Sequence, residues 1–243
     1  MKPKIILMIV VLLPIFTFAQ KDELLLGLSI GMSSPLGDFA NNEIMVTDDG
    51  YLETNGQFAK TGLAFDFSAN YRLGYNIGFA GRILGGTNKI ELDEYNNIID
   101  EQLENSNSNL IVSSKGWGSV GGYAGAYLVV PINNLYIDAR IMAGYMNLFS
   151  PQFNYLLYVD GDLTQEYIQE KYSAGGFSYD MGIGLKYKFS GNQFLLLNGD
   201  YVAAHIIKDK IHTVNPITQE PTITSMDIQY QNLTFTIGVG YIF

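Results

Sequence analysis

The last thirteen residues of the chain, 231–243, read QNLTFTIGVGYIF and indicate the fold. Every odd position from Leu233 to Phe243 is apolar, whereas Asn, Thr or Gly occupies each even position from Asn232 to Gly240. A period of two over this length is typical of a β-strand with one apolar and one polar face. The stretch therefore predicts a two-faced strand at the end of the chain.

The same alternation recurs upstream of this strand. It is sharp in 61–73, 135–145 and 177–189, where aliphatic and aromatic residues alternate with Gly, Ser, Asn, Asp, Arg and Lys. Four weaker segments complete the set, at 24–32, 77–86, 116–130 and 194–204. The sequence thus predicts an all-β chain of eight strands.

The predicted connections alternate in length. Short turns are expected at 74–76, 131–134 and 190–193, and long polar stretches at 33–60, 88–115, 148–175 and 206–228, with a short helix between Leu163 and Tyr172. Short periplasmic turns and long extracellular loops are the pattern of transmembrane barrels, whereas four such loops are rare in a soluble domain. We therefore predict an eight-stranded antiparallel up-and-down transmembrane β-barrel.

Composition favours the bilayer over a soluble sandwich or a lipocalin-like barrel. Only 16% of the 243 residues are charged, 13% are aromatic, and the polar strand faces carry few Lys or Glu. Aromatic residues gather near the short turns and the C-terminus, as an interfacial girdle requires: Tyr71, Tyr75, Tyr127, Tyr187, Phe189, Tyr241 and Phe243. The absence of Cys excludes disulfides and thiol chemistry, and a net charge of −10 argues against nucleic-acid binding.

The first residues have the features of an export signal. Lys2 and Lys4 precede an apolar run over 5–18, and 17–19 offers small residues at a cleavage site. This order is typical of a secretory signal peptide, and the run is too short to span a bilayer as a helix. We expect residues 1–19 to be cleaved and 20–243 to form the barrel in the bacterial outer membrane.

The terminal Tyr241-Ile242-Phe243 resembles the C-terminal recognition signal of outer-membrane proteins. With the segment 31–39 after the first strand, the chain resembles the small barrels of the OmpA/OmpX-like, "outer membrane protein beta-barrel domain" type. The resemblance implies that Tyr241 and Phe243 form a signal for the barrel-assembly machinery. It also implies that outer-membrane lipids surround the barrel.

The polar strand faces place charged residues inside the barrel. The candidate lumen network consists of Asp66, Arg82, Asp138, Arg140, Lys186 and Asp200, and Arg72 and Lys188 share the same face. A hairpin centred on Gly74 sets Asp66 opposite Arg82, and Lys186 falls opposite Asp200 or one diagonal step away. The small residues of 118–126 that face Asp138 and Arg140 leave room for those side chains. Because buried charges require partners, the network is interpreted as a structural plug or, alternatively, as the lining of a narrow polar pathway.

Few residues suggest catalysis or metal binding. His205 is expected on the outer face near the extracellular rim and His212 in a loop, without a nearby Ser in sequence. Asp160, Asp162 and Glu166 suit Ca²⁺ chemically, but their spacing departs from an EF-hand loop. We therefore predict no catalytic residues, metal or cofactor.

Three functions follow from these features. The first is a non-enzymatic outer-membrane barrel with a structural or surface-interaction role, whose loops would contact an extracellular ligand. The alternatives are a narrow pore for ions or small solutes, and a lipid-modifying enzyme with a site at the rim.

Deleting Phe243 is expected to lower the yield of protein in the outer membrane, because the resemblance makes this residue part of the assembly signal. Immunoblots of fractionated cells should show degraded or aggregated protein in the periplasm. A normal outer-membrane yield would contradict this assignment.

Overall fold

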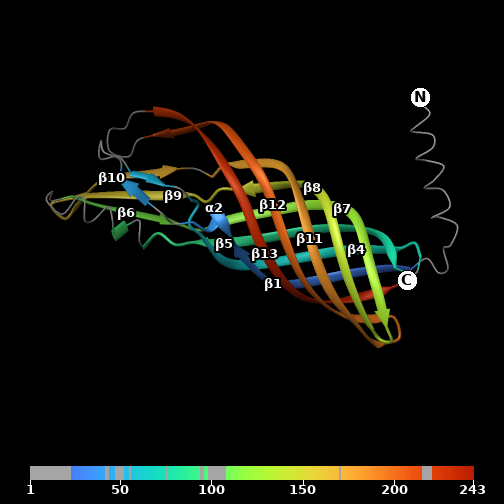
Figure 1. Cartoon of the computed structure of the whole chain (residues 1–243). Helices are drawn as coiled ribbons and strands as arrows, with labels where there is room; N and C mark the ends of the chain where they lie inside the picture. The colour runs from blue at the N-terminus through green and yellow to red at the C-terminus, as the bar shows by residue number, and fades with distance from the viewer. Residues whose placement is uncertain are drawn as a thin grey trace, which may run out of the picture.

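The computed structural model describes residues 23–41, 44–46, 52–54, 56–74, 76–93, 96–97, 108–169, 171–214 and 221–243. Within these residues, eight antiparallel strands close into one ring in the order β1-β13-β12-β11-β8-β7-β5-β4 (Figure 1). Their bounds are β1 Glu23–Pro35, β4 Ala59–Arg72, β5 Ile77–Ile90, β7 Trp117–Ile132, β8 Leu135–Phe149, β11 Ser173–Ser190, β12 Gln193–Val214 and β13 Pro221–Ile242. Each strand pairs with the next barrel strand along the chain, so the predicted up-and-down barrel is confirmed.

The hairpins at one end of the barrel are short. Ile132 pairs with Leu135, which leaves a two-residue turn at Asn133-Asn134, and Ser190 pairs with Gln193 around Gly191-Asn192. Asn133 and Gly191 have φ values of 57° and 50°, a region that Asn and Gly enter most readily. The strands β7, β11 and β12 therefore extend into the segments 131–134 and 190–193 that the sequence predicted as turns.

The opposite end of the barrel contains more secondary structure than predicted. β12 and β13 continue far beyond the expected strand ends, to the pair Val214–Pro221. His212 consequently lies in β12, paired with Ile223, and the prediction of a loop position was wrong. The chain here also forms α2 (Gly37–Ala40) and a two-stranded sheet of β2 (Ile44–Val46) and β3 (Leu52–Thr54).

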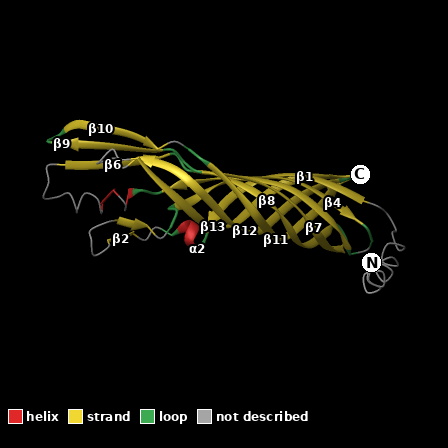
Figure 2. Ribbon diagram, turned by 90° about the horizontal axis from the view of Figure 1, so that it is seen from above, coloured by secondary structure: helices red, strands yellow, loops and turns green. Residues whose placement is uncertain are grey.

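A three-stranded sheet extends away from the barrel at this end (Figure 2). Its strands are β6 (Ser108–Ser114), β9 (Phe153–Val159) and β10 (Asp162–Gln169), in the order β10-β9-β6. The predicted helix over Leu163–Tyr172 was wrong, because Asp160-Gly161 forms a tight turn that returns β10 along β9. The φ values of 54° and 87° at these two residues suit a type I′ hairpin turn.

The apolar strand faces point outward over most of the barrel. Leu28, Phe65, Ile183 and Phe235 are 62%, 54%, 70% and 57% exposed, which is expected for side chains that meet lipid. Near the short turns the predicted aromatic residues Tyr71, Tyr187, Phe189, Tyr241 and Phe243 are also exposed. Tyr75 lies outside the described residues.

β7 is the exception to the predicted facing. Tyr123, Tyr127 and Val129 are buried inside the barrel, whereas Leu128 and Val130 are exposed. The prediction that Tyr127 belongs to the girdle, and that the even-numbered residues of 118–126 face Asp138 and Arg140, was therefore wrong. Both faces of this strand mix Gly with apolar residues, so the alternation carries no contrast to orient it.

In the described part of the chain, no helix has the length and apolarity to cross a membrane. The predicted signal segment 1–19 lies outside the described residues.

The topology predicts which insertions become accessible on intact cells. An epitope inserted at Gly161, in the β9–β10 turn, should react with an external antibody, whereas one at Asn192 should react only after permeabilisation. Each position lies in a two-residue turn, so each insertion serves as the structural control for the other. Labelling at Asn192 in intact cells would contradict the topology.

Candidate functional site

A layer of buried ion pairs crosses the middle of the barrel. Arg82 on β5 contacts three carboxylates, with Nε 2.6 Å from Asp66 Oδ1, Nη1 2.8 Å from Asp180 Oδ2 and Nη2 2.9 Å from Asp200 Oδ2. The partners come from β4, β11 and β12, so one guanidinium connects four strands. The planar fork of Arg suits this arrangement, because it presents several donors in fixed directions.

Arg140 on β8 extends the layer toward the short turns. Its Nη1 donates to Asp138 Oδ1 at 2.7 Å, and its Nε and Nη2 lie 3.0 and 2.5 Å from Asp200 Oδ1. Lys186 Nζ lies 3.3 Å from Asp138 Oδ2 and donates to Tyr127 Oη at 3.1 Å. Asp200 thus joins the two arginines into one network.

Two glycines make room for this network. A Cβ added at Gly182 would collide with the Asp200 carboxylate, and one at Gly184 would collide with that of Asp138. Both glycines lie on β11 on the same face as Asp180 and Lys186. A larger residue at either position would displace a carboxylate from its cation.

The structure places the predicted lumen residues together but changes one pairing. Asp66 contacts Arg82 as expected, although the register sets Arg82 opposite Ser68 and Asp66 opposite Leu84. The predicted Lys186–Asp200 pair was wrong, because Lys186 lies opposite Leu196 and Asp200 opposite Gly182. The tight Gly191-Asn192 turn produces this shift, since it moves the centre of the hairpin toward β11.

Asp180, Arg72 and Lys188 also lie on inward strand faces but do not belong to the predicted six-residue network. Asp180, fully buried, was missing from the predicted network although it shares the face of Lys186, and this shared face was the available signal. Arg72 does not join the network, and its Nη2 lies 2.6 Å from Glu23 Oε2. Lys188 Nζ lies 6.0 Å from the centre of the Phe194 ring.

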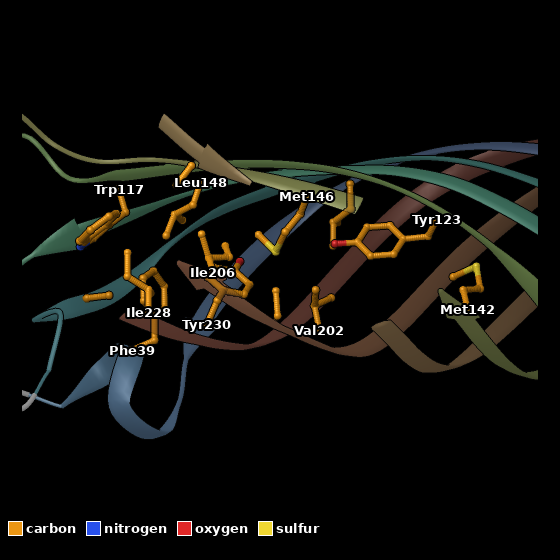
Figure 3. Packing of buried hydrophobic residues seen from close by; sticks show 14 of the residues in the cluster. Phe39, Trp117, Tyr123, Met142, Met146, Leu148, Val202, Ile206, Ile228 and Tyr230 are labelled. Atoms are coloured by element: carbon orange, nitrogen blue, oxygen red, sulfur yellow. The ribbon is translucent and has the colours of Figure 1, made fainter. Parts of the chain in front are cut away.

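Apolar side chains close the interior on both sides of the charged layer. On the side of the short turns Leu25, Phe194 and Leu196 pack together, with Tyr136 against them. On the loop side Figure 3 shows a longer series of packed side chains: Phe39, Trp117, Tyr123, Met142, Met146, Leu148, Val202, Ile206, Ile228 and Tyr230. Phe39 comes from α2 and contacts Tyr230 and Trp117 at ring-centre distances of 4.7 and 5.8 Å.

A small polar cluster lies among these loop-side residues. Asn232 Nδ2 donates to Ser33 Oγ at 2.8 Å and to Tyr230 Oη at 3.0 Å, and Ser33 Oγ donates to Asn88 Oδ1 at 3.2 Å. These bonds join β1, β5 and β13 inside the barrel. They satisfy the Asn232 Nδ2 and Ser33 Oγ donors, which would otherwise be costly to bury.

The spaces left between these layers are small. Cavities of about 10 Å³ beside Asp66 and Arg82, about 20 Å³ beside Arg72 and Tyr136, and about 10 Å³ beside Tyr123 interrupt the packing. Each is close to the minimum for a single water molecule. The described interior is therefore a packed core, as expected for eight strands.

The other candidate groups lie outside this core. His205 Nε2 is 2.6 Å from Asp227 Oδ1, and both side chains are exposed on the outer surface of β12 and β13. Asp160 lies in the β9–β10 turn, whereas Asp162 and Glu166 lie on β10. Among the described residues no three His, Cys, Asp or Glu side chains form a group suited to a metal ion.

A family model described as "Outer membrane protein beta-barrel domain" matches residues 6–243. The chain belongs to this family. Membership agrees with the ring of strands and its apolar outer face, and it places the protein among the small barrels of the bacterial outer membrane. No curated protein sequence matches the chain with significance.

Two solved structures with TM-scores above 0.5 share the fold of this chain. The outer membrane protein OprG from Pseudomonas aeruginosa aligns over 93% of this chain and 98% of its own, with 9% identity and a TM-score of 0.55. A major outer membrane protein from Thermus thermophilus aligns over 92% and 100%, with 11% identity and a TM-score of 0.53. Ail of Yersinia pestis aligns over 92% and 100%, with 13% identity and a TM-score of 0.42.

The charged layer predicts different costs for two buried carboxylates. Asp200→Asn should lower the free energy of unfolding by about 3–5 kcal/mol, because both arginines lose their shared partner. Asp180→Asn should cost less, about 1–3 kcal/mol, since Asp180 contacts only Arg82, and Arg82 keeps Asp66 and Asp200 as partners. Urea unfolding in lipid vesicles, with heat-modifiable gel mobility as the folding control, measures both. Equal costs would contradict the expectation that Asp200 contributes more to stability than Asp180.

Proposed function

We propose that this protein is a sealed, non-enzymatic barrel that anchors a surface-exposed interaction region in the outer membrane. The observation that carries the proposal is the filled interior. Apolar packing, the ion-pair layer and the loop-side cluster with Phe39 follow one another along the barrel. An arginine with three carboxylate partners contributes to a rigid core and leaves little space for solute.

The distribution of charge supports a role at the cell surface. The regions 33–60, 88–115, 148–175 and 206–228 contain 18 of the 24 acidic residues but only 6 of the 14 basic residues. This end of the barrel also carries the additional sheets and the extension of β12 and β13. An acidic surface attracts basic partners and repels acidic ones, with a strength that depends on ionic strength.

The export and assembly steps belong to the same proposal. Residues 1–19 would direct secretion and be removed, and Tyr241 and Phe243 would be recognised by the assembly machinery. In the closed ring the Phe243 N–H donates to Leu24 O at 2.9 Å, and Tyr241 pairs with Leu26. The last strand therefore both closes the barrel and carries the proposed signal.

Planar-bilayer recordings of the refolded full-length protein test the sealed interior. We expect no steady ohmic conductance, because the interior is packed and the three cavities beside Arg82, Arg72 and Tyr123 are each close to the size of one water. A 16-stranded porin in the same bilayer gives the positive control. Stable single-channel steps from folded protein would overturn the sealed barrel in favour of the pore.

A further inference from the structure

The sheet β10-β9-β6 has two edges that differ in how they are covered. On the β6 edge, the Asn96 side chain donates from Nδ2 to Val112 O at 3.0 Å, and its Oδ1 accepts from Val112 N at 3.0 Å. The amide thus occupies both backbone groups of Val112, as a neighbouring strand would. Along β10 the described residues contain no further strand.

The two faces of this sheet also differ. On one face Val112 is buried against Leu92, Phe153, Tyr155 and Leu157. On the other face Ile111, Leu163 and Ile168 are 42%, 51% and 46% exposed. The register places Ile111 and Glu166 on either side of Leu156, so these residues share the exposed face. The sheet extends beyond the end of the barrel (Figure 2), and we therefore expect this face to lie outside the bilayer.

Charge distinguishes between two candidate partners for the β10 edge, a β10 strand from a second copy of this chain and a strand from another protein. Asp162 and Glu166 are exposed on β10, and Glu166 lies on the apolar face beside Leu163 and Ile168. A second copy that added its own β10 would bring these carboxylates together, and like charges on adjacent strands are unfavourable. Negatively charged edge strands resist self-pairing in this way. The same carboxylates favour a strand that carries Lys or Arg.

We propose that β10 is a docking edge for an extended basic and apolar peptide segment of an extracellular partner. The segment adds to β10 by backbone hydrogen bonds, which supply affinity, while alternate side chains supply specificity. On the exposed face, a Lys or Arg lies opposite Glu166, and apolar residues lie beside Leu163 and Ile168. The inference rests on the proposed function, because the edge is available only if this end of the barrel faces the exterior.

A synthetic peptide, Thr-Val-Thr-Lys-Thr-Val-Thr, serves as the probe. Its Val-Lys-Val side chains lie on one face when the peptide is extended. Binding to full-length protein in nanodiscs is followed by peptide fluorescence anisotropy and by backbone amide shifts of β10. We expect saturable binding with shifts confined to β10 and β9. Two control peptides, one with Glu in place of Lys and one N-methylated at alternate residues, should bind at least about fivefold more weakly.

Charge reversal in the protein separates the proposed pairing from general electrostatics. Glu166→Lys should weaken binding of the Lys peptide about fivefold or more and strengthen binding of the Glu peptide. The matched control Asp209→Lys reverses an exposed acidic residue on β12 and should change binding by less than about twofold. Equal losses of peptide affinity in both variants would overturn the proposal that the peptide binds at the β10 edge.

Three further outcomes would also overturn the inference. They are the absence of peptide binding, equal binding of the N-methylated peptide, and concentration-dependent dimers that Glu166→Lys abolishes. None of them affects the conductance test, so failure of the docking edge is distinguishable from failure of the sealed barrel. Retained binding by a conducting barrel would overturn only the sealed interior.

Discussion

The structure depends on the need to pair every backbone N–H and C=O inside a hydrocarbon layer that offers no water. A sheet meets this requirement only when its first and last strands join. Here β1 pairs with β13 from Leu25–Ile242 to Pro35–Asn232, and eleven residue pairs close the ring. Closure also brings the start of β1 and the end of β13 to the same end of the barrel, and the surrounding lipid requires apolar faces to point outward.

Closure creates a second constraint inside the barrel. Eight strands enclose a space that side chains can fill, and the polar faces of those strands bring charges into it. The charges are compatible with burial because cations and carboxylates from different strands contact one another. Arg82 alone joins β5 to β4, β11 and β12. The same contacts that neutralise the charges also occupy the central cross-section, and this links the stability of the core to the proposed absence of conduction.

Different rules apply beyond the bilayer. The chain at the loop end can use water to satisfy backbone groups, so open edges are tolerated there. The sheet β10-β9-β6 has one edge occupied by Asn96 and one acidic edge without a neighbouring strand in the described chain. The contrast between a closed, apolar barrel and an open, acidic sheet is the physical basis for the proposed division into an anchoring part and an interacting part.

The alternating pattern by itself determined the number of barrel strands, their order and, for strands such as 177–189, which face meets lipid, because a period of two is a local property of the chain. The predicted hairpin centred on Gly74 also placed Asp66 and Arg82 near each other. The facing of β7 and the partners of Lys186 depended on tertiary structure. β7 has no polar contrast, and in the closed barrel its Tyr123 and Tyr127 side chains are buried in the interior. A two-residue turn at Gly191-Asn192 set the register that gave Lys186 to Asp138 and Asp200 to the arginines. The strand β10 formed where a local reading favoured a helix, because pairing with β9 satisfies backbone groups that a helical segment would satisfy alone.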